Sequence, residues 1–283
     1  MKLSEQWLRE WVDPPLTTEE LGEQLTMAGF EVDAIESCEP GFEKVIVARV
    51  EQVAPHPDAD RLKVCDVSTG SGMTTVVCGA NNVAVGSYFP LALPGAILSD
   101  GSEIKETMLK GINSAGMLCS GQELGLSADS EQLFELHSDA EPGANLAEYL
   151  GLNDHVFEIS ITPNRGDCFC IAGIAREIGV LNNLSLNAVE EKAIVEGIDQ
   201  SRRVSLQSAS ACPRYAGRII GGIDISKRAP DWILERLRRA DIRCINAVVD
   251  LANYVMLEMG QPMHAFDNDK LKGEIVIRLT REG

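Results

Sequence analysis

One histidine of this chain stands where a reactive side chain could reach a ligand. His264 follows a Gly-Gln-Pro stretch at 260–262, which is expected to end a helix predicted over 246–258. On such a loop a neutral imidazole could act as a general base, or orient a water molecule, near neutral pH. The residues alone leave an alternative open, a structural histidine hydrogen-bonded to backbone.

A second candidate site is a polar loop between two predicted strands. Within residues 55–63, Arg61 and Lys63 could contact phosphate groups while nearby aspartates orient them. His56 and the same acids suggest a metal site, but three ligands on one short loop rarely converge without a further shell of partners. The other interpretation is a turn stabilised by aspartate side chains and an internal Arg–Asp pair.

Charge is distributed unevenly along the chain. The net charge of −18 argues at first against nucleic-acid binding, because phosphate contacts need Lys and Arg. Residues 201–243 nevertheless hold ten basic side chains against four acids, whereas residues 40–150 hold six against fifteen. A helix predicted in the basic segment buries Ile233, Leu237 and Ala240, and its arginines are expected to lie mostly off that stripe. We predict RNA contact there, with a merely solvated helix face as the alternative. The arginines concerned are Arg236, Arg238 and Arg239.

Composition bounds the class of protein. A chain of 283 residues suits two or three domains. It has no run of 18 apolar residues and no signal-peptide pattern at its start, which indicates a cytosolic protein. Its eight cysteines form no Cys-x-x-Cys pair, so we interpret them as small buried hydrophobes and expect no metal site.

Strand signals predominate in the middle of the chain. Short runs rich in β-branched residues alternate with Gly, Asp, Ser and Asn, a pattern that suits a small barrel such as the OB fold. The pattern by itself favours the OB fold only modestly over another small β barrel. The predicted strands cover 45–53, 62–67, 74–78, 88–93 and 117–120.

Helix signals flank these strands. Ser4 is expected to cap a first helix, and Thr17 with Glu20 forms a capping box for a second. A later helix over 171–181 is predicted with Asp167 as its cap. The remaining predictions are strands at 212–225 and 273–279 and a helix whose first residue is Pro230. The last strand has no partner after it, which predicts that the chain is the N-terminal part of a longer protein.

Two groups of motifs make the chain similar to one known family. Pro-His-Pro-Asp-Ala-Asp-Arg-Leu at 55–62 and Gly-Ile-Asn-Ser-Ala-Gly at 111–116 resemble the tRNA-binding OB domain of several translation proteins. Asn-Ala-Val-Val-Asp at 246–250 and Gly-Gln-Pro-Met-His-Ala-Phe-Asp at 260–267 resemble the editing region of the phenylalanyl-tRNA synthetase beta subunit. That family carries both groups in this order. The resemblance, to the bacterial type, covers essentially the whole chain as an N-terminal portion.

The resemblance implies a multidomain α+β fold. Residues 40–150 would form a five-stranded OB-type barrel that binds tRNA. This barrel would be inserted in an N-terminal α/β domain made of 1–39 and 151–198. Residues 199–283 would begin an editing domain of the B3/B4 type. Its further pocket residues, including a glutamate in a Gly-Gly-Glu stretch, would follow Gly283.

The resemblance also implies roles for single residues. His264 matches the histidine of the family's hydrolytic editing pocket, Asn253 its asparagine in Thr-Asn-Tyr-Val, and Arg243 the place of a pocket arginine. Ala252 stands where the family usually carries threonine, so a hydroxyl group that bears on rate or selectivity is missing. In the OB region the implied RNA contacts are Arg61, Lys63 and Ser114.

The implied enzyme is a ligase that joins phenylalanine to its tRNA with ATP and Mg²⁺. Its aminoacylation site lies on an alpha subunit in an α2β2 assembly, while the beta subunit binds tRNA for phenylalanine and hydrolyses mischarged tyrosyl-tRNA. Residues 1–283 contain no Gly-x-x-x-x-Gly-Lys-Ser/Thr loop, so we expect neither a cofactor in them nor aminoacylation by them alone. The expected setting is the cytoplasm, without DNA or membrane partners.

Two rival functions were weighed against this one. A freestanding OB-type tRNA-binding module would not need the segment after Asp199. A freestanding deacylase built around His264 would not need the OB region. The presence of both motif groups in one chain therefore favours the beta-subunit interpretation.

Overall fold

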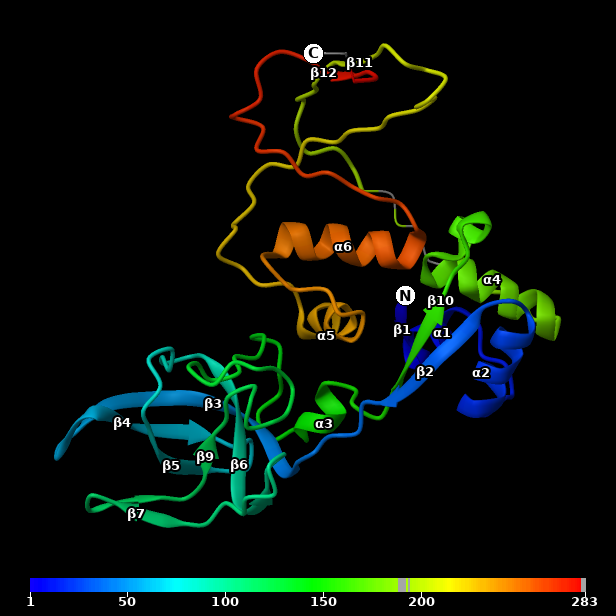
Figure 1. Ribbon diagram of the computed structural model, residues 1–283. Helices are drawn as coiled ribbons and strands as arrows, with labels where there is room; N and C mark the ends of the chain where they lie inside the picture. The colour runs from blue at the N-terminus through cyan, green and yellow to red at the C-terminus, as the bar shows by residue number, and fades with distance from the viewer. Residues whose placement is uncertain (188–191, 193, 281–283) are drawn as a thin grey trace.

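Two helices at the centre of the molecule separate a β-rich region, a mixed region that holds the N-terminus, and a set of loops around two short strands (Figure 1). This computed structural model describes residues 1–187, 192 and 194–280. Residues 182–199 have a weak sequence pattern typical of a linker, and part of this stretch lies outside the described residues. The fold is mixed α and β with several small sheets, as predicted at that level.

The sheet of the mixed region joins segments that are far apart in the chain. Strand β10 (His155–Ser160) lies between β1 (Lys2–Ser4) and β2 (Glu31–Ser37) and is antiparallel to both. The chain therefore leaves this sheet after β2, forms the β-rich region, and returns to the middle of the same sheet. Two covalent connections consequently link the β-rich region to the N-terminal sheet.

Local side-chain caps start the first two helices, as the sequence predicts. Helix α1 (Glu5–Trp11) begins after Ser4, whose Oγ accepts a hydrogen bond from the amide of the helix's third residue. Helix α2 (Thr18–Met27) begins with the predicted capping box between Thr17 and Glu20. Each cap satisfies amides that have no partner inside the helix.

The predicted cap of the next long helix is wrong. Helix α4 (Ile171–Asn182) begins after Cys170, whose sulfur accepts from an amide of the first turn. Asp167 instead lies in a short 3-10 helix, η1 (Pro163–Cys168), where its carboxylate pairs with Arg165. The tight 3-10 turn ends before α4 begins, so the start of α4 moves beyond the reach of the aspartate.

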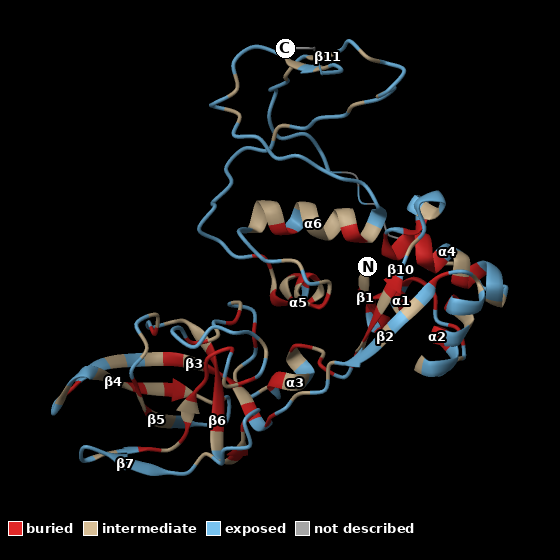
Figure 2. Ribbon diagram, viewed as in Figure 1, coloured by how far each residue is buried: buried red, intermediate tan, exposed pale blue. Residues whose placement is uncertain are grey.

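Apolar side chains of these helices and of the sheet form one core. Figure 2 shows buried residues along α4 and β10. Burying one large aliphatic or aromatic side chain stabilises a fold by about 1.5–3 kcal/mol. Fully buried members of this core include Trp7, Leu8, Leu21, Phe157, Ile174 and Ile178.

The five predicted strands of the β-rich region are confirmed. They form an antiparallel sheet in the order β5-β4-β3-β6-β9. The amide of Ala115 donates to the carbonyl of Thr75 at 3.0 Å, so the chain beside β9 approaches β5 at the opposite edge. A short hairpin, β7–β8, was not predicted. The strands are β3 (Glu43–His56), β4 (Ala59–Ser68), β5 (Met73–Cys78), β6 (Tyr88–Ile97), β7 (Thr107–Leu109), β8 (Ile112–Ser114) and β9 (Met117–Leu118).

The glycines of the 111–116 motif have conformational roles. Lys110 and Gly111 both have positive φ, at 45° and 87°, and form the two-residue turn between β7 and β8. Gly116 has a φ of 140°, and a Cβ there would lie 2.7 Å from the carbonyl oxygen of Ala92. Glycine at position 116 therefore allows the backbone to approach β6 closely, and a side chain there would push β6 away.

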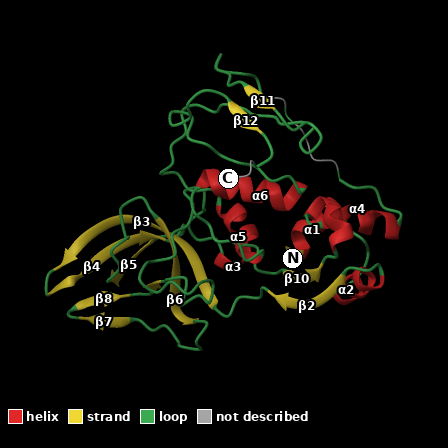
Figure 3. Cartoon of the chain, turned by 45° about the horizontal axis from the view of Figure 1, so that its top comes forward, coloured by secondary structure: helices red, strands yellow, loops and turns green. Residues whose placement is uncertain are grey.

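The C-terminal segment contributes two helices to the centre of the molecule. Helices α5 (Asp231–Arg239) and α6 (Ala247–Met259) contact each other, and Ile233, Leu237 and Leu257 enter the core of the mixed region. Two short strands in this segment pair in parallel; they are β11 (Val204–Leu206) and β12 (Ile275–Ile277), and Figure 3 shows loops around them. A last short helix is α3 (Leu146–Tyr149). No helix in the described ranges is long and apolar enough to cross a membrane.

Two details of the C-terminal segment differ from prediction. Residues 212–225 form turns and loops rather than a strand, and Ile220 and Ile225 in them are exposed. β-branched residues form a stable strand only where a neighbouring strand and an apolar surface are available, and this segment packs against neither. Pro230 precedes α5 as its N-cap instead of being its first residue.

The cysteines are mainly small buried side chains, as predicted, although Cys244 is exposed. Burial raises the pKa of the Cys119 thiol to about 12 and that of Cys65 to about 11. A thiol reacts as its thiolate. We therefore expect iodoacetamide at pH 8 to leave both residues unmodified in the folded chain and to modify them in urea, as read by peptide mass. Equal modification in both conditions would contradict this burial.

Candidate functional site

His264 lies on an exposed loop, as predicted. Gly260 ends α6 with a φ of 74°, and the loop that follows carries His264 and Phe266, whose rings lie 6.4 Å apart. Among the residues that the structure describes, no hydrogen bond to the imidazole is found. The surroundings therefore do not support a structural role in which backbone groups hold this histidine.

The three predicted editing residues are distributed along α6. Arg243 is exposed in the turn before the helix, Asn253 is half-buried in its middle, and His264 follows its end. A helix of 13 residues is roughly 20 Å long at about 1.5 Å per residue. In the described part of the chain no hydrogen bond or ion pair joins the three. Such a row could contact separate parts of an extended ligand.

The three RNA contacts implied for the β-rich region differ in availability. Arg61 is exposed near the turn between β3 and β4. The ammonium of Lys63 donates to three carbonyl groups at 3.3–3.5 Å, those of Ala80, Asn81 and Val83. Ser114 is buried, and its Oγ accepts from the Val77 amide while donating to the Gly116 carbonyl. Of the three residues, Arg61 is the exposed one, while Lys63 and Ser114 hold backbone segments together.

His56 has a structural environment. Its side chain is buried, Nε2 lies 3.2 Å from the carbonyl oxygen of Leu109, and Nδ1 accepts from the Asp58 amide at 3.1 Å. Both ring nitrogens are therefore engaged by backbone. This arrangement agrees with the turn interpretation of the 55–63 loop.

The expectation that the arginines of α5 lie mostly away from its buried surface is wrong for two of them. Arg236 lies between Trp7 and Trp232, with its guanidinium 4.9 and 5.1 Å from the ring centres, and it pairs with Glu10. Arg239 is buried. These side chains are enclosed because segments distant in the sequence cover α5 on several sides. The apolar stripe of α5, read from its sequence, does not reveal those segments. RNA binding by the three arginines stays a prediction, and each would have to leave an intrachain partner.

A buried ion pair is the best-defined polar site in the molecule. Arg239 Nη1 donates to Asp154 Oδ2 at 2.7 Å, and both side chains are nearly inaccessible to solvent. Asp154 also accepts from Ser4 Oγ at 2.5 Å and from the Gln6 amide at 2.9 Å. The remaining nitrogen, Arg239 Nε, is buried and has no hydrogen-bond partner within the described part of the chain. This ion pair was not predicted from the sequence. The feature that could have indicated it is an acidic residue, Asp154, directly before the apolar strand β10.

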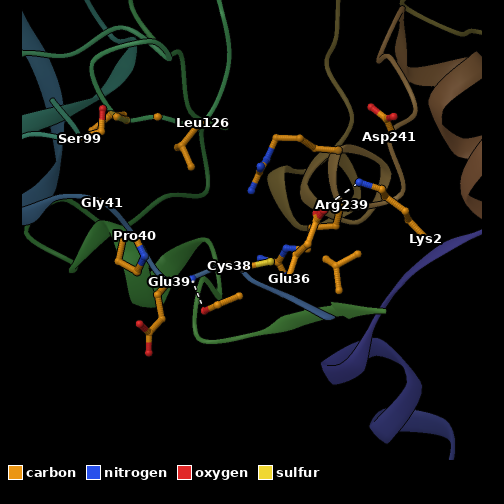
Figure 4. Close-up of a pocket in the computed structure, with 15 residues that line it drawn as sticks. Lys2, Glu36, Cys38, Glu39, Pro40, Gly41, Ser99, Leu126, Arg239 and Asp241 are labelled. Atoms are coloured by element: carbon orange, nitrogen blue, oxygen red, sulfur yellow. Dashed lines mark hydrogen bonds and ion pairs between the residues drawn. The ribbon is translucent and has the colours of Figure 1, made fainter. Parts of the chain in front are cut away.

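A cavity of about 400 Å³ lies beside this ion pair (Figure 4). Ser99 and Leu126 of the β-rich region are on one side, and Lys2, Arg239 and Asp241 are on the other. Its lining charges are partly satisfied within the chain, since Lys2 pairs with Glu36 at 3.3 Å and Arg238 with Glu235 at 2.6 Å. The cavity marks a junction between regions that are not closely packed.

One cluster of acidic and sulfur groups resembles a metal site in composition. Single ligand atoms of Asp167, Cys168 and Glu177 lie within 4.8 Å of one another. Arg165 Nη2 lies 2.6 Å from Glu177 Oε1 and 3.2 Å from Asp167 Oδ2. The guanidinium thus neutralises these carboxylates and supplies the positive charge that a metal cation would otherwise bring.

Comparison with known proteins gives a consistent result. A family model described as "Putative tRNA binding domain" matches residues 45–145, and one described as "B3/4 domain" matches residues 211–283. The chain is 49% identical over 283 residues to the phenylalanine–tRNA ligase beta subunit of Hahella chejuensis. The corresponding subunits of Dechloromonas aromatica and Legionella pneumophila are 49% identical over 282 residues and 51% over 284. These matches take 99–100% of this chain but span only 36% of the length of each relative.

Proposed function

The chain belongs to the phenylalanine–tRNA ligase beta-subunit family, and we propose that it binds tRNA and contributes to the hydrolytic editing of mischarged tyrosyl-tRNA. The observation that supports this most strongly is the identity of about one half to such subunits along the whole chain. Because both family models match within one chain, a freestanding tRNA-binding module or deacylase is less well supported. ATP with Mg²⁺, an alpha subunit in an α2β2 assembly, tRNA for phenylalanine and a cytoplasmic setting belong to this proposal.

We propose that residues 40–150 form an OB-type barrel. The five-stranded antiparallel sheet and the approach of the chain beside β9 to β5 support it. In this division, residues 1–39 and 151–198 make one domain around the β1-β10-β2 sheet. Residues 199–283 begin a B3/B4-type editing domain, whose helices α5 and α6 also pack on that first domain.

RNA contact by the β-rich region is proposed to centre on Arg61. Of the basic side chains named for this region, it is the exposed one, whereas backbone carbonyls hold the ammonium of Lys63. An exposed guanidinium can pair with a phosphate at little desolvation cost. It lies near the start of β4, shortly after the turn that joins β3 to β4, and loops between strands meet oligonucleotides in OB folds.

We expect Arg61→Gln to weaken binding of tRNA by the 283-residue chain. The slope of log affinity against log salt should flatten by about 0.7–0.9 if one phosphate contact is lost. Filter binding over a salt series measures both quantities. Lys105→Gln is the matched control, because its side chain is 72% exposed in the same region and already pairs with Glu103. An equal effect of the two variants would argue against a specific contact at Arg61.

Editing is proposed to involve the residues along α6. His264 would orient or deprotonate the attacking water, Asn253 would hydrogen-bond the substrate, and Arg243 would hold a phosphate of the tRNA's 3′ end. Support comes from the exposure of His264 and from the spread of the three residues along the helix. The absence of a hydroxyl at Ala252 is expected to affect rate or selectivity, and Ala252→Thr in the intact enzyme would measure it.

A further inference from the structure

The β-rich region and the N-terminal mixed region do not share a hydrophobic core. The buried residues of the mixed region form one cluster, and those of the β-rich region form two others. Between them lies the charged cavity of about 400 Å³ that is lined by both regions. Apolar packing therefore does not fix the orientation of one region relative to the other, and polar contacts must contribute to it.

The first turn of α5 binds the β-rich region. Asp231 is buried, and its Oδ2 accepts from the His137 amide at 2.6 Å and from the Tyr149 hydroxyl at 2.8 Å. Arg228 Nη1 donates to the Glu135 carbonyl at 2.6 Å, and Arg228 Nη2 lies 3.5 Å from Asp231 Oδ1. Burial and Asp231 raise the pKa of Tyr149, so the phenol remains a proton donor.

The last turn of α5 binds the chain where it returns from the β-rich region to the sheet. Arg239 Nη2 donates to the carbonyl groups of Leu150 and Gly151 at 2.7 and 2.9 Å, while Nη1 pairs with Asp154. The middle of the same helix places Ile233 and Leu237 in the core of the mixed region. One nine-residue helix therefore contacts both regions and the connection between them.

We propose that Asp231 and Arg239 are positioning residues that fix the β-rich region relative to α5 and α6. We call the contacts of Asp231 with His137 and Tyr149, and of Arg239 with Leu150, Gly151 and Asp154, the α5 clasp. Helix α6 packs on α5, and Trp232 and Tyr254 meet edge to face there with ring centres 5.4 Å apart. The clasp thereby fixes the distance between the proposed RNA contact at Arg61 and the editing residues on α6, and this consequence rests on the proposed function.

Amide hydrogen exchange at His137 tests the clasp directly. In the 283-residue chain we expect Asp231→Ala to speed exchange of this amide by about 10-fold or more, because a hydrogen bond to a buried carboxylate is lost. Tyr149→Phe, which keeps the ring, should give a smaller increase in the same direction. Asp231→Asn should restore slow exchange, since its side-chain oxygen still accepts. Amides of β3 should be unchanged in all three variants.

Asp224→Ala serves as the matched control, because it removes the same charge from an exposed residue whose carboxylate accepts from the neighbouring Ser226. Unchanged exchange at His137 in both Asp231→Ala and Tyr149→Phe would overturn the clasp.

Binding of tRNA separates this outcome from a failure of the proposed function. Loss of the clasp should weaken tRNA binding by about 10-fold or more. When the two regions are no longer held relative to each other, tRNA bound at one region has a lower effective concentration at the other. It should leave binding of a short single-stranded RNA, which reaches only one region, unchanged. Absence of tRNA binding by the unaltered chain would count against the function, while the exchange result would still decide the clasp.

Discussion

His264→Ala in an intact ligase built on this sequence is expected to slow deacylation of tyrosyl-tRNA by about 10²–10⁴-fold, the range typical of general acid–base help. The ester is already activated, so the imidazole needs only to orient or deprotonate water. The side chain is exposed, and among the described residues it holds no backbone group. Phenylalanine charging and thermal stability should stay nearly unchanged. Release of tyrosine from preformed tyrosyl-tRNA measures the effect.

Met263→Ala is the matched control for the histidine. It removes an exposed side chain from the same loop without removing a titratable group. If the two variants deacylate tyrosyl-tRNA at the same rate as the unaltered enzyme, His264 has no part in editing. A lowered melting temperature with normal deacylation would instead assign it the structural role that the sequence left open.

Asp154→Ala is expected to lower the free energy of unfolding of the 283-residue chain by about 3–5 kcal/mol, the range seen when one partner of a buried ion pair is removed. The change removes the nearer of two carboxylates from the buried Arg239 guanidinium, which keeps only Glu235 at 3.7 Å, a carboxylate that Arg238 already pairs with. It also removes the acceptor for the Ser4 hydroxyl and the Gln6 amide. Urea unfolding followed by circular dichroism measures the loss.

Glu36→Ala is the comparison for that prediction. It breaks the pair with Lys2, in which the Glu36 side chain is 57% exposed, and surface pairs contribute only about 0–1 kcal/mol. A loss at Asp154 no larger than the loss at Glu36 would show that the buried pair does not stabilise the fold. The combination of Asp154→Leu with Arg239→Met should recover much of the stability, because no unpaired charge then remains buried.

Several features of the fold could be predicted from sequence because short-range interactions determine them. The caps at Ser4 and Thr17 depend on residues within one helical turn. The strands of the β-rich region follow from alternating β-branched residues. Position 116 adopts a backbone conformation that residues other than glycine avoid, which explains the glycine there. The strand predicted at 212–225 failed because a strand also needs a neighbour, which a local pattern cannot supply.

The candidate editing site could be predicted in part. The glycine and proline after α6 place His264 on a loop, and that required only the local sequence. Where Asn253 and Arg243 lie relative to it depends on the length and direction of α6. The structure places Arg243 before the helix, Asn253 within it and His264 after it, an order that suits contacts with separate parts of one ligand.

The amino-acid sequence by itself determined the caps of α1 and α2, the strands of the β-rich region, the exposed loop of His264 and the family resemblance. The tertiary structure alone decided the environment of the α5 arginines. Local charge predicted a basic surface, but Arg239 meets Asp154 across 85 residues of chain and is buried there. Whether an arginine faces solvent or an acid depends on which distant segments pack around its helix, and helical periodicity carries no information about those segments.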